Sequence, residues 1–94
     1  MDLSKNIQSE IITLANKYNI NKVILFGSRA RGDNKERSDI DIAVSGGNVI
    51  EFRLAIEDEV RTLLMFDVVN LDEPVQKPLL QSIENEGVIL YEKI

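Results

Sequence analysis

Hydrophobic residues recur along this chain at two different spacings, and these spacings predict its elements. From 3 to 18 the apolar positions follow the period of a helix, and the same period returns from 49 to 64. Asp2 or Ser4 could cap the first of these helices, and Asn19 offers a stop after it. The pattern therefore predicts two amphipathic helices that each bury one face.

Four short segments have the composition of strands instead. They are 22–26 (KVILF), 39–44 (DIDIAV), 65–71 (MFDVVNL) and 88–91 (VILY). Residues 45–48 (SGGN) predict a turn, and 79–83 fits a short helix that stops at Gly87. A loop or short helix follows the first strand. This alternation predicts an α/β (α+β) fold, a small mixed four-stranded sheet with helices packed on it, and leaves the strand directions open.

Length and composition indicate one soluble globular domain spanning 1–94. The chain has 94 residues, of which 44% are hydrophobic and 29% charged. It has no cysteine and no histidine, which excludes disulfides, thiolate or imidazole metal sites, and nucleophile pairs built on histidine. A bound metal would need oxygen ligands and would be a hard cation. Without an apolar signal segment or a membrane-length run, we expect a cytoplasmic protein with no membrane partner.

The charge balance limits the kind of partner. The formal net charge is −5, so we expect no direct nucleic-acid binding through a broad phosphate-contacting face. Basic residues nevertheless gather around one stretch: Lys22, Arg29, Arg31, Lys35 and Arg37. This cluster indicates either a small anionic ligand or a solvated charged loop, and charge alone favours the loop.

Two aspartates stand in the second predicted strand. Asp39 and Asp41 are two positions apart, so they share one face while Ile40 and Ile42 point to the core. Carboxylates held so close repel each other, and one would protonate unless a cation neutralised them. A divalent cation with oxygen ligands is one explanation, and a strand with one solvated face is the alternative.

A third carboxylate strengthens the metal interpretation. Asp67 lies in an apolar strand, where an isolated charge costs several kcal/mol unless it is paired or lies on an open face. If that strand neighbours the strand of Asp39, three carboxylates converge, as in sites that hold two divalent metals roughly 3.5–4 Å apart for nucleotidyl transfer. Asp72, near Pro74, is a rival third ligand that is more typical of a turn.

The sequence Gly27-Ser28 closes the first strand. Backbone N–H groups at the start of a helical turn can bind an anion, and glycine allows a ligand to approach the backbone. A triphosphate could lie on this turn with its reacting phosphate at the aspartates. The alternative is an ordinary β-turn that binds no ligand. Neither a P-loop nor a dinucleotide-binding glycine motif is present.

The stretch GSRARGDNKERSDIDIAV combines Gly-Ser, ten residues and Asp-x-Asp, and FDVVNLDE follows later. This combination resembles the nucleotidyltransferase superfamily that includes DNA polymerase beta and the aminoglycoside nucleotidyltransferases. The residues of this motif and the short length of the chain are similar to those of the minimal members, the MNT antitoxins of HEPN/MNT toxin–antitoxin pairs. The resemblance covers about 20–91.

The resemblance implies a role for each matching residue. Gly27 and Ser28 would bind the triphosphate, and we add Arg29, the next residue of the basic cluster, to the nucleotide-binding set. The metal-binding and catalytic residues would be Asp39, Asp41 and Asp67, with Asp67 also helping to activate the attacking hydroxyl.

The expected function follows from the same resemblance. It is an enzyme, a protein adenylyltransferase that uses Mg²⁺, as two ions, and ATP as substrate. It would transfer AMP to a tyrosine of a HEPN-type RNase toxin and so silence it as an antitoxin. The chain lacks the added domains with which larger relatives bind their own acceptor, which favours a partner protein. The alternatives are a non-catalytic antitoxin that acts by binding its toxin, and nucleotidyl transfer to a small-molecule hydroxyl.

Overall fold

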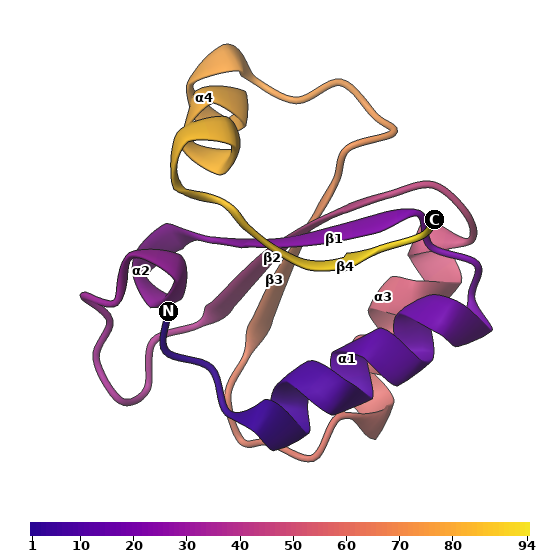
Figure 1. The fold of residues 1–94 in the computed structure, drawn as a ribbon, viewed down its shortest axis with the longest axis horizontal. Coiled ribbons are helices and arrows are strands. Elements are labelled where there is room, and N and C mark those ends of the chain that lie inside the picture. The colour runs from indigo at the N-terminus through magenta and orange to yellow at the C-terminus, as the bar shows by residue number, and fades with distance from the viewer.

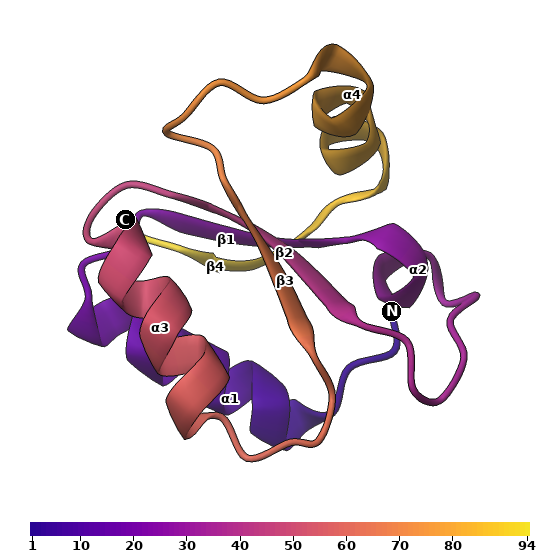
Figure 2. The same cartoon turned by 180° about the vertical axis from the view of Figure 1, so that it is seen from behind.

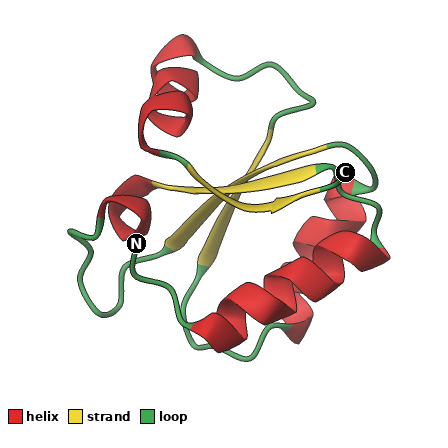
Figure 3. Ribbon diagram, viewed as in Figure 1, coloured by secondary structure: helices red, strands yellow, loops and turns green.

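A computed structural model describes all 94 residues and shows helices and strands in strict alternation (Figures 1 and 3). The elements are α1 (Lys5–Lys17), β1 (Lys22–Phe26), α2 (Gly27–Arg31), β2 (Ile40–Ser45), α3 (Val49–Glu59), β3 (Phe66–Asn70), α4 (Lys77–Glu86) and β4 (Val88–Glu92). The predicted α/β fold is thereby confirmed. The longest helix has 13 residues, and none of the helices has the length and apolar character needed to cross a membrane.

The four strands form one mixed sheet in the order β3-β2-β1-β4. Strand β1 is antiparallel to both of its neighbours, β2 and β4, whereas β2 and β3 run parallel. In this register Asp41 on β2 lies beside Phe26 on β1 and beside Asp67 on β3. Strand β3 is an edge strand, so a residue on it has only one strand neighbour.

The two faces of the sheet are covered unequally. Helices α1 and α3 lie against one face, and α4 stands on the opposite side (Figures 1 and 2). Ile40, Ile42 and Val44 of β2 belong to the main core of 16 buried residues under α1 and α3. The residues between them, Asp41 and Ala43, point to the other face because side chains alternate along a strand. The aspartate is therefore on the sparsely covered face.

The first helix begins after Ser4, one of its two predicted caps, and is shorter than the predicted 3–18 by two residues at its start and one at its end. The Ser4 hydroxyl accepts a hydrogen bond from the Ile7 N–H at 3.2 Å, as an N-cap residue does. The chain leaves α1 at Tyr18, and Asn19 takes a left-handed backbone conformation with φ +57°. Asparagine tolerates this conformation better than most residues, and the chain turns there towards β1.

The predicted helix over 49–64 is wrong at its C-terminal end. Helix α3 ends at Glu59, and Val60 is already extended. The Thr62 hydroxyl accepts a hydrogen bond from the Leu64 N–H at 3.1 Å and fixes a turn, while Leu63, which the helical spacing placed in the core, is fully exposed. The turn brings the chain back to start β3 beside β2. Strand β2 also starts one residue later than predicted, so Asp39 precedes it.

Candidate functional site

The turn between β1 and α2 is built on Gly27. Its φ is +73°, a backbone conformation that side chains disfavour. A Cβ added at Gly27 would collide with Asp41 Oδ2 and lie 3.2 Å from Asp41 Cγ. Glycine therefore allows α2 to begin directly against the carboxylate of β2, with Ser28 as the next residue of the turn.

Asp41 is the centre of the predicted carboxylate group. It is half-buried on β2, with Asp67 as its register partner on the parallel strand β3. Asp39 lies two residues earlier, just before β2, and is exposed. The sheet thus brings Gly27, Asp41 and Asp67 together in space, although 40 positions separate the first from the last.

The electrostatics of the site converge on Asp41. Burial raises the pKa of its carboxyl above the ordinary value of 3.8, and the negative charges of Asp67 and then Asp39 raise it further. The positive charge of Arg31 lowers the same pKa. This point of the sheet therefore has an excess of negative charge, which a bound cation would relieve.

The three carboxylates do not form a group compact enough to hold a metal ion by themselves. Asp39 and Asp67 are exposed, and Asp67 occupies an edge strand. Asp67 thus has the open surroundings in which its charge carries little desolvation cost, and the desolvated carboxylate is Asp41. The donor set still fits a hard divalent cation, because it contains only oxygens and its central carboxylate is short of positive charge.

The structure gives Arg29 a different environment from the one predicted. Its side chain is 6% exposed, and its guanidinium donates hydrogen bonds to three backbone carbonyls, those of Asp2, Glu36 and Ser38. Three of its five N–H donors are engaged in this way, on a side chain that is buried inside the protein. These contacts favour a structural role for Arg29, and its assignment to nucleotide binding stays a prediction.

Arg31 is the residue that the sequence reasoning missed. It was only one member of the basic cluster, yet its charge acts directly on Asp41. Its guanidinium donates to Asp33 at 3.1 Å and to Glu86 of α4 at 2.7 Å, and these hydrogen bonds, first that of Asp33, raise the pKa of Arg31. The side chain is 44% exposed, so it is accessible from solvent. No sequence signal distinguishes Arg31 from Arg29.

Asp72 behaves as the sequence indicated for a turn residue. Its Oδ2 accepts a hydrogen bond from the Gly46 N–H at 2.9 Å, and its own N–H donates to the side chain of Asn70 at 2.9 Å. Its carboxylate therefore stabilises the turn after β2, one full strand length from Asp41.

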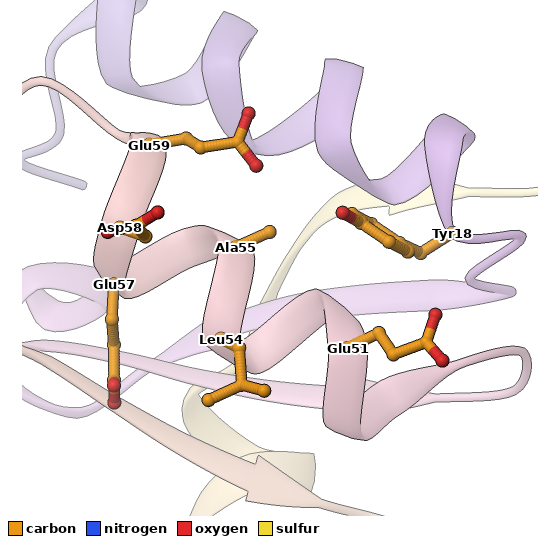
Figure 4. A pocket seen from close by; sticks show the side chains of 7 residues that line it. All are labelled: Tyr18, Glu51, Leu54, Ala55, Glu57, Asp58 and Glu59. Carbon is orange, nitrogen blue, oxygen red and sulfur yellow. The ribbon is translucent and has the colours of Figure 1, made fainter.

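A hollow in the surface lies away from this site. It has a volume of about 560 Å³ and lies between α3 and the end of α1 (Figure 4). Its lining residues are Tyr18, Glu51, Leu54, Ala55, Glu57, Asp58 and Glu59. Four of these are acidic, so this hollow has the wrong charge for a triphosphate.

Comparisons with known proteins point to one family. The sequence profile described as "Polymerase beta, Nucleotidyltransferase" matches residues 9–94. A chain of Methanocaldococcus jannaschii named "Putative protein adenylyltransferase" is 42% identical over 71 residues, which is 73% of this chain and 69% of that one. A second chain of the same organism with the same description is 28% identical over 95 residues, or 94% of this chain and 95% of that one.

Solved structures show the same fold. A toxin–antitoxin structure with AMP-PNP has a TM-score of 0.73 at 25% identity, over 92% of this chain and 73% of that one. The toxin–antitoxin MntA-HepT has a TM-score of 0.69 at 21% identity, over 96% and 74%, and therefore speaks for the fold alone. The profile covers most of the chain, and the first relative exceeds 40% identity. This chain belongs to the polymerase beta nucleotidyltransferase family and is a nucleotidyltransferase.

Proposed function

We propose that this chain is a Mg²⁺-dependent protein adenylyltransferase that acts as an antitoxin. It would transfer AMP from ATP to a hydroxyl, that of a tyrosine, on a partner toxin of the HEPN RNase type in the cytoplasm. The observation that carries the proposal is the meeting of Gly27, Asp41 and Asp67 on one face of the sheet. Relatives named as protein adenylyltransferases and a toxin–antitoxin neighbour with an ATP analogue support the reaction and the partner.

The turn and the carboxylates would bind different phosphates of the nucleotide. The backbone N–H groups after Gly27 and the hydroxyl of Ser28 would bind the leaving phosphates, and Arg31 would add positive charge on release from Glu86. The reacting α-phosphate would then lie against Asp39 and Asp41. This arrangement orients the triphosphate so that its pyrophosphate end leaves towards α2.

The reaction forms one bond and breaks one. The acceptor hydroxyl oxygen attacks the α-phosphorus, an O–P bond forms, and the bond to the bridging oxygen of the β-phosphate breaks to release pyrophosphate. The chain has no histidine, so a carboxylate is the side chain best suited to take the hydroxyl proton, and Asp67 is exposed on the edge strand where an acceptor protein can reach it. We propose that Asp67 accepts the proton of the attacking hydroxyl.

Asp39, Asp41 and Asp67 are the residues that would hold Mg²⁺, as two ions bound together with the nucleotide. When bound, the cation supplies positive charge that stabilises the charge developing on the reacting phosphate. Because Mg²⁺ commonly binds through one or two carboxylates plus substrate phosphates, a site that is incomplete without nucleotide is expected for this cation.

The decisive experiment mixes the protein with its partner at a ratio well below one, with ATP and Mg²⁺. Partner RNase activity and intact mass are then followed together. A catalyst should silence many partners per molecule, add mass in units of AMP, and leave the partner silent after the antitoxin is removed. Asp41→Ala should abolish the mass gain, because it removes stabilisation needed in the transition state.

Asp58→Ala, on the distant face of α3, is the matched control and should transfer AMP at the wild-type rate. A partner that gains no mass and is silenced only at a ratio of one, without ATP, would overturn the enzymatic proposal in favour of a binding antitoxin. AMP found on a small hydroxyl compound and never on the partner would indicate the small-molecule reaction instead.

A further inference from the structure

Arg29 is the one charged residue among the buried residues of this chain. Its three hydrogen bonds end on different parts of the backbone: Nε donates to Ser38 O at 3.0 Å, Nη1 to Asp2 O at 3.1 Å and Nη2 to Glu36 O at 2.9 Å. The Asp2 N–H returns a bond to the Arg29 carbonyl at 2.8 Å. The residue therefore links α2 both to the N-terminal segment and to the loop before β2, which lie beside it (Figures 1 and 3).

These contacts depend on the shape of the guanidinium more than on its charge. The nearest carboxylate oxygen, on Asp2, lies 3.9 Å away, and that side chain is 66% exposed. At that separation, and with the carboxylate mostly in solvent, the ion pair contributes little. Three carbonyls around one planar group require several donors in a fixed fork, which arginine has and lysine does not. The fork therefore fixes the geometry of the loop.

The loop ends at Asp39, which is held on both sides. Its preceding carbonyl, that of Ser38, accepts from Arg29, and its following N–H, that of Ile40, donates to Met65 O at 2.9 Å. Asp39 itself lies outside β2 and is exposed. No strand pairing of its own fixes this carboxylate, so its position depends on these two neighbouring anchors.

We propose that Arg29 is a positioning residue that sets Asp39 relative to the Gly27-Ser28 turn of the same short helix. It would not touch the nucleotide. It would hold the carboxylate at the distance from the turn that a metal–nucleotide complex requires. The inference rests on the proposed function only for the role of Asp39 as a ligand of the cation.

The test is Arg29→Lys, which keeps the charge and loses the fork. The probe is Mn²⁺ with AMP-PNP: free Mn²⁺ is titrated by electron paramagnetic resonance and nucleotide affinity is measured by calorimetry. A misplaced carboxylate should raise the Mn²⁺ concentration for half-saturation about 10- to 100-fold, as loss of an outer-shell partner does. AMP-PNP affinity at saturating Mn²⁺ should change less than threefold. Arg29→Gln is the second variant, with the same expected direction.

Glu36→Ala and Asp2→Ala are the matched controls, because each removes a side chain and keeps the carbonyl that Arg29 uses. Both should bind Mn²⁺ as the wild type does. Thermal unfolding identifies a merely structural role: a lower Tm with unchanged Mn²⁺ half-saturation well below that Tm would overturn the inference. Loss of AMP-PNP affinity that persists at saturating Mn²⁺ would overturn it too, because Arg29 would then contact the nucleotide.

The two proposals fail in different ways. A wild type that binds Mn²⁺ with AMP-PNP and transfers no AMP to its partner contradicts the proposed function, while the Arg29 variants still test the positioning role by their Mn²⁺ affinity. If Asp39→Asn binds Mn²⁺ with the same affinity as the wild type, Asp39 is not a ligand of the cation, and the positioning role is contradicted.

Discussion

Gly27 and Asp41 meet with no room for a methyl group between them. The left-handed backbone of Gly27 directs its missing Cβ at the Asp41 carboxylate, 3.2 Å from Cγ. The contact joins the end of β1 to the middle of the site across the antiparallel pair, and it fixes the spacing between the turn and the carboxylate.

Gly27→Ala should therefore lose both stability and transfer. The left-handed conformation should cost about 1–3 kcal/mol, and the displaced carboxylate should abolish AMP transfer. Gly32→Ala is the matched control: its φ is +86°, but its Cβ would meet nothing nearer than 4.0 Å. Urea unfolding and transfer rates should show similar losses of stability and a loss of rate in Gly27→Ala alone. Equal rates in both variants would contradict the steric role of Gly27.

Asp41→Asn should stabilise the protein when metal is absent. The raised pKa of Asp41 means that the folded protein favours the protonated carboxyl. Protonated Asp41 therefore contributes fully to the free energy of unfolding below pH 3.8, and this contribution is lost as the pH rises through the pKa of the folded state. The variant should gain free energy of unfolding at about pH 7, and the gain should fade below pH 3.8. Urea unfolding across this range measures it, with Asp58→Asn as the control. A gain that does not depend on pH would point to packing instead.

Glu86→Gln should tighten nucleotide binding. Glu86 holds Arg31 at 2.7 Å, and a triphosphate would compete for the same guanidinium. The lost ion pair is partly exposed, so stability should change little. Calorimetry with AMP-PNP and Mg²⁺ should show a lower Kd for Glu86→Gln and a higher Kd for Arg31→Gln. Glu84→Gln, exposed on the same helix, is the control. Unchanged affinity in Arg31→Gln would exclude Arg31 from phosphate binding.

Asp72→Ala should lower stability and leave AMP transfer intact, whereas Asp67→Ala should abolish transfer without lowering stability. Removing the Asp72 acceptor leaves the Gly46 N–H unpaired and should cost about 0.5–1.5 kcal/mol while transfer continues. Removing Asp67 should leave stability intact or raise it, because a repulsive neighbour of Asp41 is lost, and should abolish transfer. Thermal unfolding and the AMP mass gain measure the two effects. Loss of transfer in Asp72→Ala would restore it as the rival ligand.

The sequence is sufficient for most of the elements, because periodicity reports which face of an element is buried. It fails where apolar spacing continues past the end of an element, as at Leu63, which suits a helix yet lies in a turn stabilised by Thr62. Strand direction is beyond it, because the sheet order that puts β2 parallel to β3 depends on long-range packing.

For the site, the spacing predicts the pairing of Asp39 with Asp41 but cannot tell which carboxylate is desolvated. That depends on sheet position: Asp41 lies on an inner strand, and Asp67 on an edge. The sequence also cannot distinguish the role of Arg29 from that of Arg31, because the two differ only in the direction in which their side chains point. Arg29 turns into the backbone of its own loop, and Arg31 turns outwards to Glu86.

Helix α4 rests on a small second cluster, since Ile83 is its only buried residue and packs with Phe26 and Ala43. So little buried area predicts that α4 opens locally far more often than the main core does. Its amide protons should exchange with solvent first. Because Glu86 binds Arg31, a nucleotide that captures Arg31 would release the end of α4 and speed this exchange further. The arrival of ATP would then be readable as a change in the motion of α4, a helix that carries none of the predicted site residues.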